Sequence, residues 1–134
     1  MAGYSGTPLP KKLGIKENFR IGFVNAPKTF TSLLGELPHN VRITSRLSSP
    51  MDLVVLFVDR EAKLAQQFAR VAETLAKNGM LWVAWPKKSS GVTTNLSFEN
   101  VQRIGLDFGL VDVKICAIDE VWSGLKFVYR VKDR

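Results

Sequence analysis

The stretch Asp52-Leu-Val-Val-Leu-Phe-Val-Asp59 decides the fold class, because six apolar residues stand in a row between two aspartates. A short apolar run of this kind is typical of a parallel strand that is buried on both faces of a sheet. After it, apolar residues recur at helical spacing and predict a helix over residues 61–77. The apolar positions of this helix are Leu64, Phe68, Val71 and Leu75. Asn78-Gly79 predicts a left-handed end for it.

Further elements follow on both sides of this strand and helix. The predicted strands cover residues 19–25, 41–47, 53–58, 80–85, 110–118 and 125–131. The predicted helices follow Thr29, Asp59 and Ser97, whose side chains are of the kind that caps a helix N-terminus. The last helix is predicted to end at Gly109. The turn signal Trp122-Ser123-Gly124 predicts that the last two strands form an antiparallel pair.

Buried strands that alternate with helices predict a mostly parallel sheet with helices on both faces. The sequence therefore predicts a three-layer α/β/α fold of Rossmann-like topology with a C-terminal antiparallel strand pair. Residues 1–18 are rich in Gly, Pro and Lys and are predicted to form an irregular basic arm. Residues 19–134 are predicted to form a single α/β domain.

Composition limits the classes of function. The 134 residues carry 19 Lys and Arg against 12 Asp and Glu, a formal net charge of +7 that favours an anionic partner. The single Cys excludes an internal disulfide, and one Cys with one His disfavours a zinc site. No apolar run approaches the ~20 residues that span a bilayer, and no apolar segment of a secretory signal follows Lys11 and Lys12. We therefore expect a cytoplasmic protein without a membrane partner.

From Asp52 onward, the sequence resembles the C-terminal half of the class I S-adenosylmethionine methyltransferases. The run Asp52-Leu-Val-Val-Leu-Phe-Val is similar to a strand of that family, and Leu75-Ala-Lys-Asn-Gly79-Met-Leu-Trp-Val is similar to its next helix end, turn and strand. The helix end at Phe108-Gly109-Leu110 and the predicted strand pair resemble the closing elements. The resemblance implies an abridged methyltransferase-like fold.

The N-terminal half departs from that family at two positions of the cofactor site. The family has a Gly-rich turn after its first strand, and this chain has Val24-Asn25-Ala26-Pro27-Lys28 instead. The family usually places an acidic residue after the second strand to hold ribose hydroxyls, and this chain has Ser45-Arg46. An arginine favours a phosphate over a diol.

A second resemblance covers nearly the whole chain. Its segments are Gly3-Tyr-Ser-Gly-Thr-Pro-Leu9, Lys11-Lys-Leu-Gly-Ile15, Trp85-Pro-Lys-Lys-Ser-Ser-Gly91 and Ala117-Ile-Asp-Glu-Val-Trp-Ser-Gly-Leu125. These segments are similar to those of a family of short bacterial proteins of unknown function. The resemblance implies a bacterial source and implies no reaction.

The candidate ligand site lies where the parallel strands end, because ligands of open α/β sheets bind outside the carboxyl ends of the strands. Lys87 and Lys88 supply charge, Ser89 and Ser90 supply hydroxyls, and Gly91 permits a tight turn. Such a loop can hold a phosphate or a carboxylate, although a merely solvated loop has the same composition. The neighbouring strand ends are predicted to contribute Asn25, Lys28 and Arg46.

A secondary candidate group is formed by Asp119, Glu120, Trp122 and Ser123 near the final turn. Adjacent carboxylates can act as acid and base, but Asp119 in a turn is more typical of a backbone cap. His39 is predicted to lie at the surface, and Cys116 within an apolar strand is predicted to be a buried small hydrophobe. No catalytic or metal-binding residue is predicted.

The N-terminal arm and the C-terminal tail carry much of the positive charge. Lys11, Lys12, Lys16 and Arg20 belong to the first, and Lys126, Arg130, Lys132 and Arg134 belong to the second. If the arm folds near the last strand, a basic face results that could bind nucleic acid. The arm could instead order itself against a second copy in a homodimer.

Three functions remain open. The leading hypothesis is a non-catalytic binding or regulatory module that recognises an anionic small molecule at the carboxyl edge and needs no cofactor. The first alternative is a divergent small S-adenosylmethionine-dependent transferase that uses the same crevice. The second alternative is a basic nucleic-acid-associated protein.

Overall fold

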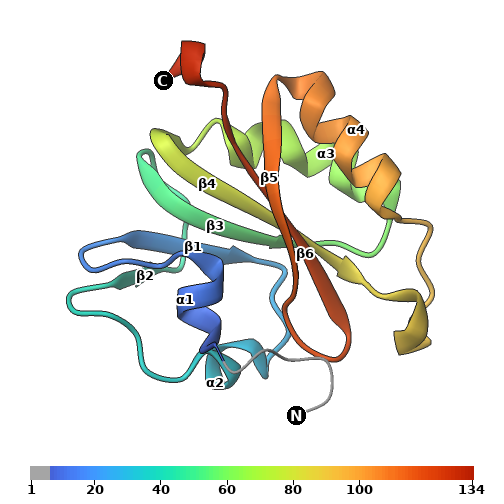
Figure 1. The fold of residues 1–134 in the computed structure, drawn as a ribbon, viewed down its shortest axis with the longest axis horizontal. Coiled ribbons are helices and arrows are strands. Elements are labelled where there is room, and N and C mark those ends of the chain that lie inside the picture. Colours follow the sequence, from blue (N-terminus) through green and yellow to red (C-terminus); the bar gives the residue numbers. More distant parts are fainter. Residues whose placement is uncertain (1–6) are drawn as a thin grey trace.

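The computed structural model describes residues 7–134, which form a six-stranded sheet with helices on both faces (Figure 1). The strands are β1 (Arg20–Val24), β2 (Arg42–Thr44), β3 (Met51–Phe57), β4 (Leu75–Pro86), β5 (Leu110–Ala117) and β6 (Trp122–Tyr129). The helices are α1 (Leu9–Leu13), α2 (Phe30–Leu34), α3 (Glu61–Ala72) and α4 (Phe98–Phe108), with short 3-10 turns at Lys88–Ser90 and Val131–Asp133.

The strand order in the sheet is β2-β1-β3-β4-β6-β5. Strands β1 to β4 run parallel, whereas β6 is antiparallel to both β4 and β5. The chain passes from β1 to β2 on one side, and β3 then lies on the other side of β1. The predicted mostly parallel, Rossmann-like sheet with a C-terminal antiparallel pair is confirmed.

The apolar run in β3 is central because both of its faces are covered. Val54 and Leu56 pack in one core layer with residues of α3 and α4. Leu53, Val55 and Phe57 pack in the other layer with residues of α1 and α2. All five side chains are buried, as expected for a strand that is apolar at every position.

Helix α3 is shorter than predicted, because the chain leaves the helix at Ala72 and reaches the sheet by Leu75. The backbone N–H of Met51 donates to the carbonyl of Thr74, and Met51 then pairs with Leu75. Leu75 therefore belongs to β4 although its spacing fits the helical stripe. The prediction of a left-handed Gly79 is also wrong: the site excludes a side chain because a Cβ would lie 2.8 Å from the Met51 carbonyl oxygen.

One of the three predicted helix caps is confirmed. Ser97 accepts a hydrogen bond from the Asn100 N–H, and the Asn100 side chain accepts one from the Ser97 N–H, which forms a capping box. Thr29 precedes α2 but makes no capping hydrogen bond. Asp59 lies one residue too early, and the Asn95 side chain instead accepts from the N–H of Glu61.

The predicted turn at Trp122-Ser123-Gly124 is wrong, because these residues form the start of β6. The chain turns at residues 118–121 instead, where the Asp119 carboxylate accepts hydrogen bonds from the N–H groups of Val121 and Trp122. Gly124 is needed for packing: a Cβ there would lie 2.9 Å from Ile118 and 3.0 Å from Trp82. Strand β2 is also shorter than predicted.

The N-terminal segment is only partly irregular among the residues that the structure describes. Residues Leu9–Leu13 form α1, which ends at Gly14 in a left-handed conformation. Leu13 is fully buried, and its carbonyl accepts a 2.8 Å hydrogen bond from the indole N–H of Trp82. Residues 1–6 of the predicted arm lie outside the described residues. Among the helices of residues 7–134, none has the length and apolar character that crossing a membrane requires.

Candidate functional site

The carboxyl edge of the sheet collects the segments that follow β1, β3 and β4, together with the turn that precedes β6. The switch point of this sheet lies between β1 and β3, because the chain leaves β1 toward one side and β3 occupies the other. In open α/β sheets, ligands bind at this place. The residues at the switch point are therefore the first to consider.

Asn25 occupies the switch point and joins both strands to α3. Its amide Nδ2 donates to the Phe57 carbonyl at 3.0 Å and to the Gln67 Oε1 at 2.9 Å. The backbone φ of Asn25 is 60°, a left-handed conformation that asparagine adopts more readily than most residues. Asn25 thus provides the sharp turn that a glycine would provide, with a side chain that bridges the strand ends.

The two basic residues predicted at these strand ends are separate from the hydrogen bonds of Asn25. Lys28 is exposed in the loop before α2, and Arg46 is exposed in the loop after β2. No ion pair is found for either side chain within residues 7–134. Both therefore present unneutralised charge at the edge, without forming one hydrogen-bonded site with Asn25.

The loop at residues 87–91 is an ordered 3-10 turn. Its fold uses the Ser90 hydroxyl, which donates to the Lys87 carbonyl at 2.6 Å and accepts from the Val92 N–H at 3.1 Å. Gly91 is left-handed at φ 79°. Lys88 and Ser89 remain exposed, so their side chains are the donors that this loop presents to solvent.

The structure brings the primary and secondary candidate segments together. The Lys87 N–H donates to the Val121 carbonyl at 2.7 Å, so the loop after β4 lies against the turn before β6. Asp119 is held in that turn as a backbone cap, whereas Glu120 is exposed. Ser123 is part of β6 and pairs with Trp85 and Ala117.

A row of aromatic side chains supports this edge and was missed by sequence reasoning. The ring of Phe30 lies 4.9 Å from both Phe23 and Phe57, and Phe57 lies 5.1 Å from Trp122, all in edge-to-face contact. These rings come from β1, α2, the end of β3 and the start of β6. They give the carboxyl edge a rigid apolar base, with Phe23 and Trp122 only partly buried.

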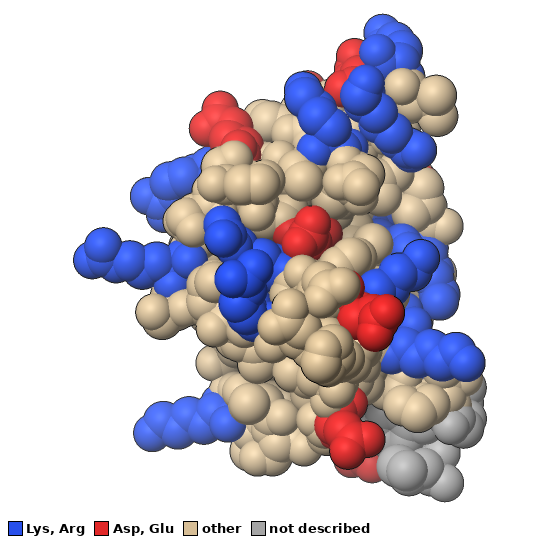
Figure 2. Space-filling view, turned by 90° about the vertical axis from the view of Figure 1, so that its left-hand side faces the viewer, with Lys and Arg blue, Asp and Glu red and all other residues tan. Residues whose placement is uncertain are grey.

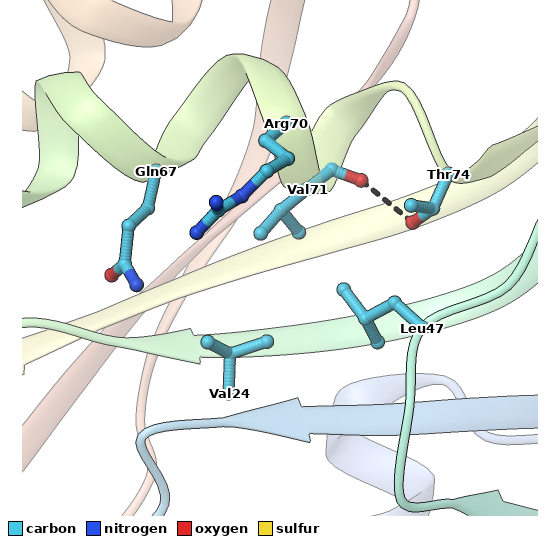
Figure 3. Close-up of a pocket in the computed structure, with 6 residues that line it drawn as sticks. All are labelled: Val24, Leu47, Gln67, Arg70, Val71 and Thr74. Carbon is cyan, nitrogen blue, oxygen red and sulfur yellow. Dashed lines mark hydrogen bonds between the residues drawn. The ribbon is translucent and has the colours of Figure 1, made fainter.

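A groove of about 310 Å³ opens next to Asn25 on the α3 face (Figure 3). It is lined by Val24, Leu47, Gln67, Arg70, Val71 and Thr74. The groove lies between α3 and the loop of only six residues that connects β2 to β3, where parallel strands usually need a longer crossover. Leu47 from this loop packs over Gly22, where a Cβ would lie 2.5 Å from its Cδ2.

The remaining titratable candidates do not form a reactive site. His39 is exposed, as predicted. Cys116 is half-buried rather than buried; burial raises the pKa of its thiol, while Lys12, Lys114 and Lys126 lower it. Within residues 7–134, no group of three or more His, Cys, Asp or Glu side chains is placed to hold a metal ion.

Positive charge is not confined to the carboxyl edge. Figure 2 shows the opposite side of the molecule, where Lys and Arg side chains are spread over the surface with fewer acidic ones between them. The formal charge of +7 therefore does not by itself select the loop at residues 87–91 as the anion site.

No known family profile matches the chain, and no curated protein matches it in sequence. Solved structures do match. Aeropyrum pernix fibrillarin with bound S-adenosyl-L-methionine is 16% identical at a TM-score of 0.58, over 94% of this chain and 70% of that one. The magnesium protoporphyrin IX methyltransferase of Synechocystis, also with bound cofactor, is 9% identical at 0.62, over 91% and 74%.

A methyltransferase dependent on S-adenosylmethionine from Aquifex aeolicus matches along most of both chains. It is 14% identical at a TM-score of 0.56, and the match spans 87% of this chain and 85% of that one. Identities this low establish the fold and leave the activity open. The chain has the Rossmann-like fold that these S-adenosylmethionine-dependent methyltransferases share.

Proposed function

We propose that this protein binds S-adenosylmethionine at the carboxyl edge of its sheet and acts as a divergent transferase. The fold likeness carries the proposal, since two of the matching structures hold this cofactor and resemble more than nine-tenths of this chain. The switch point between β1 and β3 is the place where such folds bind ligands. The bound cofactor would supply an electrophilic methyl group for transfer to a nucleophilic acceptor.

The polar groups at this edge fit those of the cofactor. The exposed carboxylate of Asp59, two residues after the end of β3, would accept hydrogen bonds from ribose hydroxyls. The Thr94 hydroxyl donates to the main-chain carbonyl of Asp59 at 2.7 Å and so holds the backbone at this residue. The ammonium of Lys28 or Lys88 would hold the carboxylate of the amino-acid moiety. Asn25 would hold the backbone turn that approaches the ligand.

Arg46 favours a second candidate, an anion-binding module at the same edge. It follows β2, where the methyltransferases place an acidic residue, and its guanidinium suits a phosphate. Lys28 and Lys88 add two exposed positive charges, and none of the three has an ion pair among residues 7–134. This candidate predicts that inorganic phosphate or a phosphorylated small molecule binds without any transfer reaction.

Calorimetric titration with S-adenosylmethionine, S-adenosylhomocysteine and inorganic pyrophosphate separates the two candidates. A transferase binds the first two, and Asp59→Asn weakens that binding about tenfold because an amide oxygen is a weaker acceptor for the ribose hydroxyls than a carboxylate. An anion module binds pyrophosphate, and Lys88→Gln or Arg46→Gln weakens it. Lys63→Gln removes an equal charge from the exposed face of α3 and is the matched control.

The outcomes are distinct. Binding of either cofactor species that Asp59→Asn weakens supports the transferase, and S-adenosylhomocysteine release on adding acceptors would establish turnover. Pyrophosphate binding alone supports the anion module. If none of the three ligands binds at about 1 mM, both candidates are rejected. A ligand of the native state at a concentration far above its Kd also stabilises the fold by a measurable amount.

A further inference from the structure

Four lysines from separate parts of the sequence gather on one face of the C-terminal hairpin. Lys114 of β5 and Lys126 of β6 are direct cross-strand partners. Lys12 of α1 and Lys16, shortly after α1, come from the N-terminal segment and lie beside this pair. A basic face was expected if the N-terminal arm folds near the last strand, and the described part of the arm does so. In Figure 1 no helix covers the side of β5 and β6 that faces the viewer.

Hydrogen bonds hold the N-terminal segment against the hairpin. The Lys12 ammonium donates to the Ala117 carbonyl at 2.8 Å, and the Lys114 ammonium donates to the Lys12 carbonyl at 3.4 Å. The Lys126 ammonium lies 5.8 Å from the centre of the Trp82 ring, in a cation–π arrangement. The positions of these ammonium groups are thus defined by the fold rather than by free side-chain motion.

Among residues 7–134, neither Lys114 nor Lys126 has a carboxylate within ion-pair distance. The ion pair found among residues 7–134 joins Arg103 to Glu61, and neither of the two lysines takes part in it. Like charges directly opposite each other in a sheet destabilise it. Partial burial lowers the pKa of Lys126, and the charges of Lys114 and Lys16 lower it further. A bound anion would relieve this repulsion.

We propose that this face, defined by Lys12, Lys16, Lys114 and Lys126, binds the phosphate backbone of nucleic acid. Lysine ammonium groups are point charges that suit phosphates, and several fixed in one surface match a chain of them. The site lies on the hairpin and is independent of the ligand proposed for the carboxyl edge.

The character of the face selects nucleic acid over a lipid surface. The exposed apolar side chain of Ile115 alternates with Lys114 and therefore points to the opposite side of β5. Ile115 therefore adds no apolar group to the lysine face that would insert into a bilayer. Trp82 beneath Lys126 is fully buried and offers no ring for base stacking. Binding is therefore expected to depend on phosphates and not on base sequence.

Fluorescence anisotropy with a labelled 20-nucleotide single strand of mixed sequence, and with its duplex, tests the proposal in the full chain. Four phosphate contacts on a single strand give a slope of about −2.8 in log K against log salt, or a loss of roughly fiftyfold from 50 to 200 mM. Lys114→Gln and Lys126→Gln should each weaken binding several-fold and reduce the slope by about 0.7. A second mixed sequence should bind equally well.

Lys63→Gln is the matched control, because it removes the same charge from an exposed position on α3, across the sheet. The proposal is overturned if this variant weakens binding as much as Lys114→Gln, since net charge alone would then explain the affinity. It is also overturned if neither nucleic acid binds at 50 mM salt, including the case in which phosphatidylserine vesicles bind instead. Unfolding curves of the variants confirm that they are folded at the assay temperature.

Discussion

At the scale of single residues, Asn25 keeps the left-handed backbone conformation that a glycine would adopt and adds a side-chain amide that forms hydrogen bonds. A glycine there would leave the space between β1 and β3 open, whereas Asn25 places an amide across it and bonds Phe57 and Gln67. Asn25→Gly keeps the left-handed turn and loses these bonds, whereas Asn25→Ala loses the bonds and strains the backbone. We expect Asn25→Ala to be about 1 kcal/mol less stable than Asn25→Gly in urea unfolding. Equal stabilities would show that φ is not restrained at this position.

Cys116 carries a pH dependence whose sign follows from its surroundings. Burial raises the pKa of the folded thiol, so the native state keeps this proton to a higher pH than the unfolded chain. Its contribution to stability is complete below the unfolded pKa and is lost as the pH rises through the folded pKa. Native Cys116 should therefore react with iodoacetamide more slowly at pH 8 than the protein in denaturant.

The lysines around Cys116 provide the control for that measurement. Lys114 lowers the pKa of the thiol, so Lys114→Gln should raise it further and slow alkylation again. Lys63→Gln, on α3, should leave the rate unchanged. An alkylation rate that increases in Lys114→Gln would contradict the electrostatic effect assigned to these lysines.

At the scale of elements, helices α2 and α4 give a matched pair of variants, because Thr29 precedes the first and Ser97 precedes the second. Ser97 accepts from the Asn100 N–H at the start of α4, whereas Thr29 makes no such bond at the start of α2. Ser97→Ala should lower the free energy of unfolding by about 1 kcal/mol, and Thr29→Ala should leave it nearly unchanged. Chemical denaturation monitored by tryptophan fluorescence measures both. Equal losses would mean that the capping box contributes nothing specific.

The sequence correctly predicted those elements whose residue pattern fits only one type of secondary structure. The apolar run of β3 is buried on both faces, so no other element type competes for it. Leu75 fits the stripe of α3 equally well, and only its pairing with Met51 assigns it to β4. Gly124 resembles a turn residue, yet it is small so that Ile118 and Trp82 can pack against it. Long-range pairing, which local pattern does not contain, decided these cases.

At the scale of the whole molecule, the sequence could place the candidate site at one edge of the sheet, but it could not predict which of its residues contact one another. The carboxyl edge follows from strand order, whereas the contact between Lys87 and Val121, which joins the loop after β4 to the turn before β6, was not predicted. The aromatic row and the groove beside α3 depend on how distant elements pack. The groove in particular is lined by β1, the loop between β2 and β3, and α3, which the sequence pattern does not bring together.

The charge of the whole molecule makes a final prediction about stability. A formal charge of +7 on a chain of this size repels itself, and Lys114 opposite Lys126 concentrates part of that repulsion. Lys114→Gln also loses the long, exposed 3.4 Å bond to the Lys12 carbonyl, but relief of the repulsion should outweigh that loss and make the variant more stable than the unmodified protein by about 0.5 kcal/mol at low salt. Raising the salt from 0.01 to 1 M shortens the screening length from about 30 to 3 Å, so the difference should vanish.

Lys63→Gln separates local from global repulsion in the same experiment. It lowers the net charge equally but lies on α3, away from the hairpin, so it should stabilise the protein less than Lys114→Gln does. Urea unfolding of both variants at the two salt concentrations gives the comparison. If the two are stabilised equally, the repulsion is spread over the whole surface. A hairpin variant that gains stability while losing affinity for nucleic acid would show that the opposed lysines serve binding at the expense of stability.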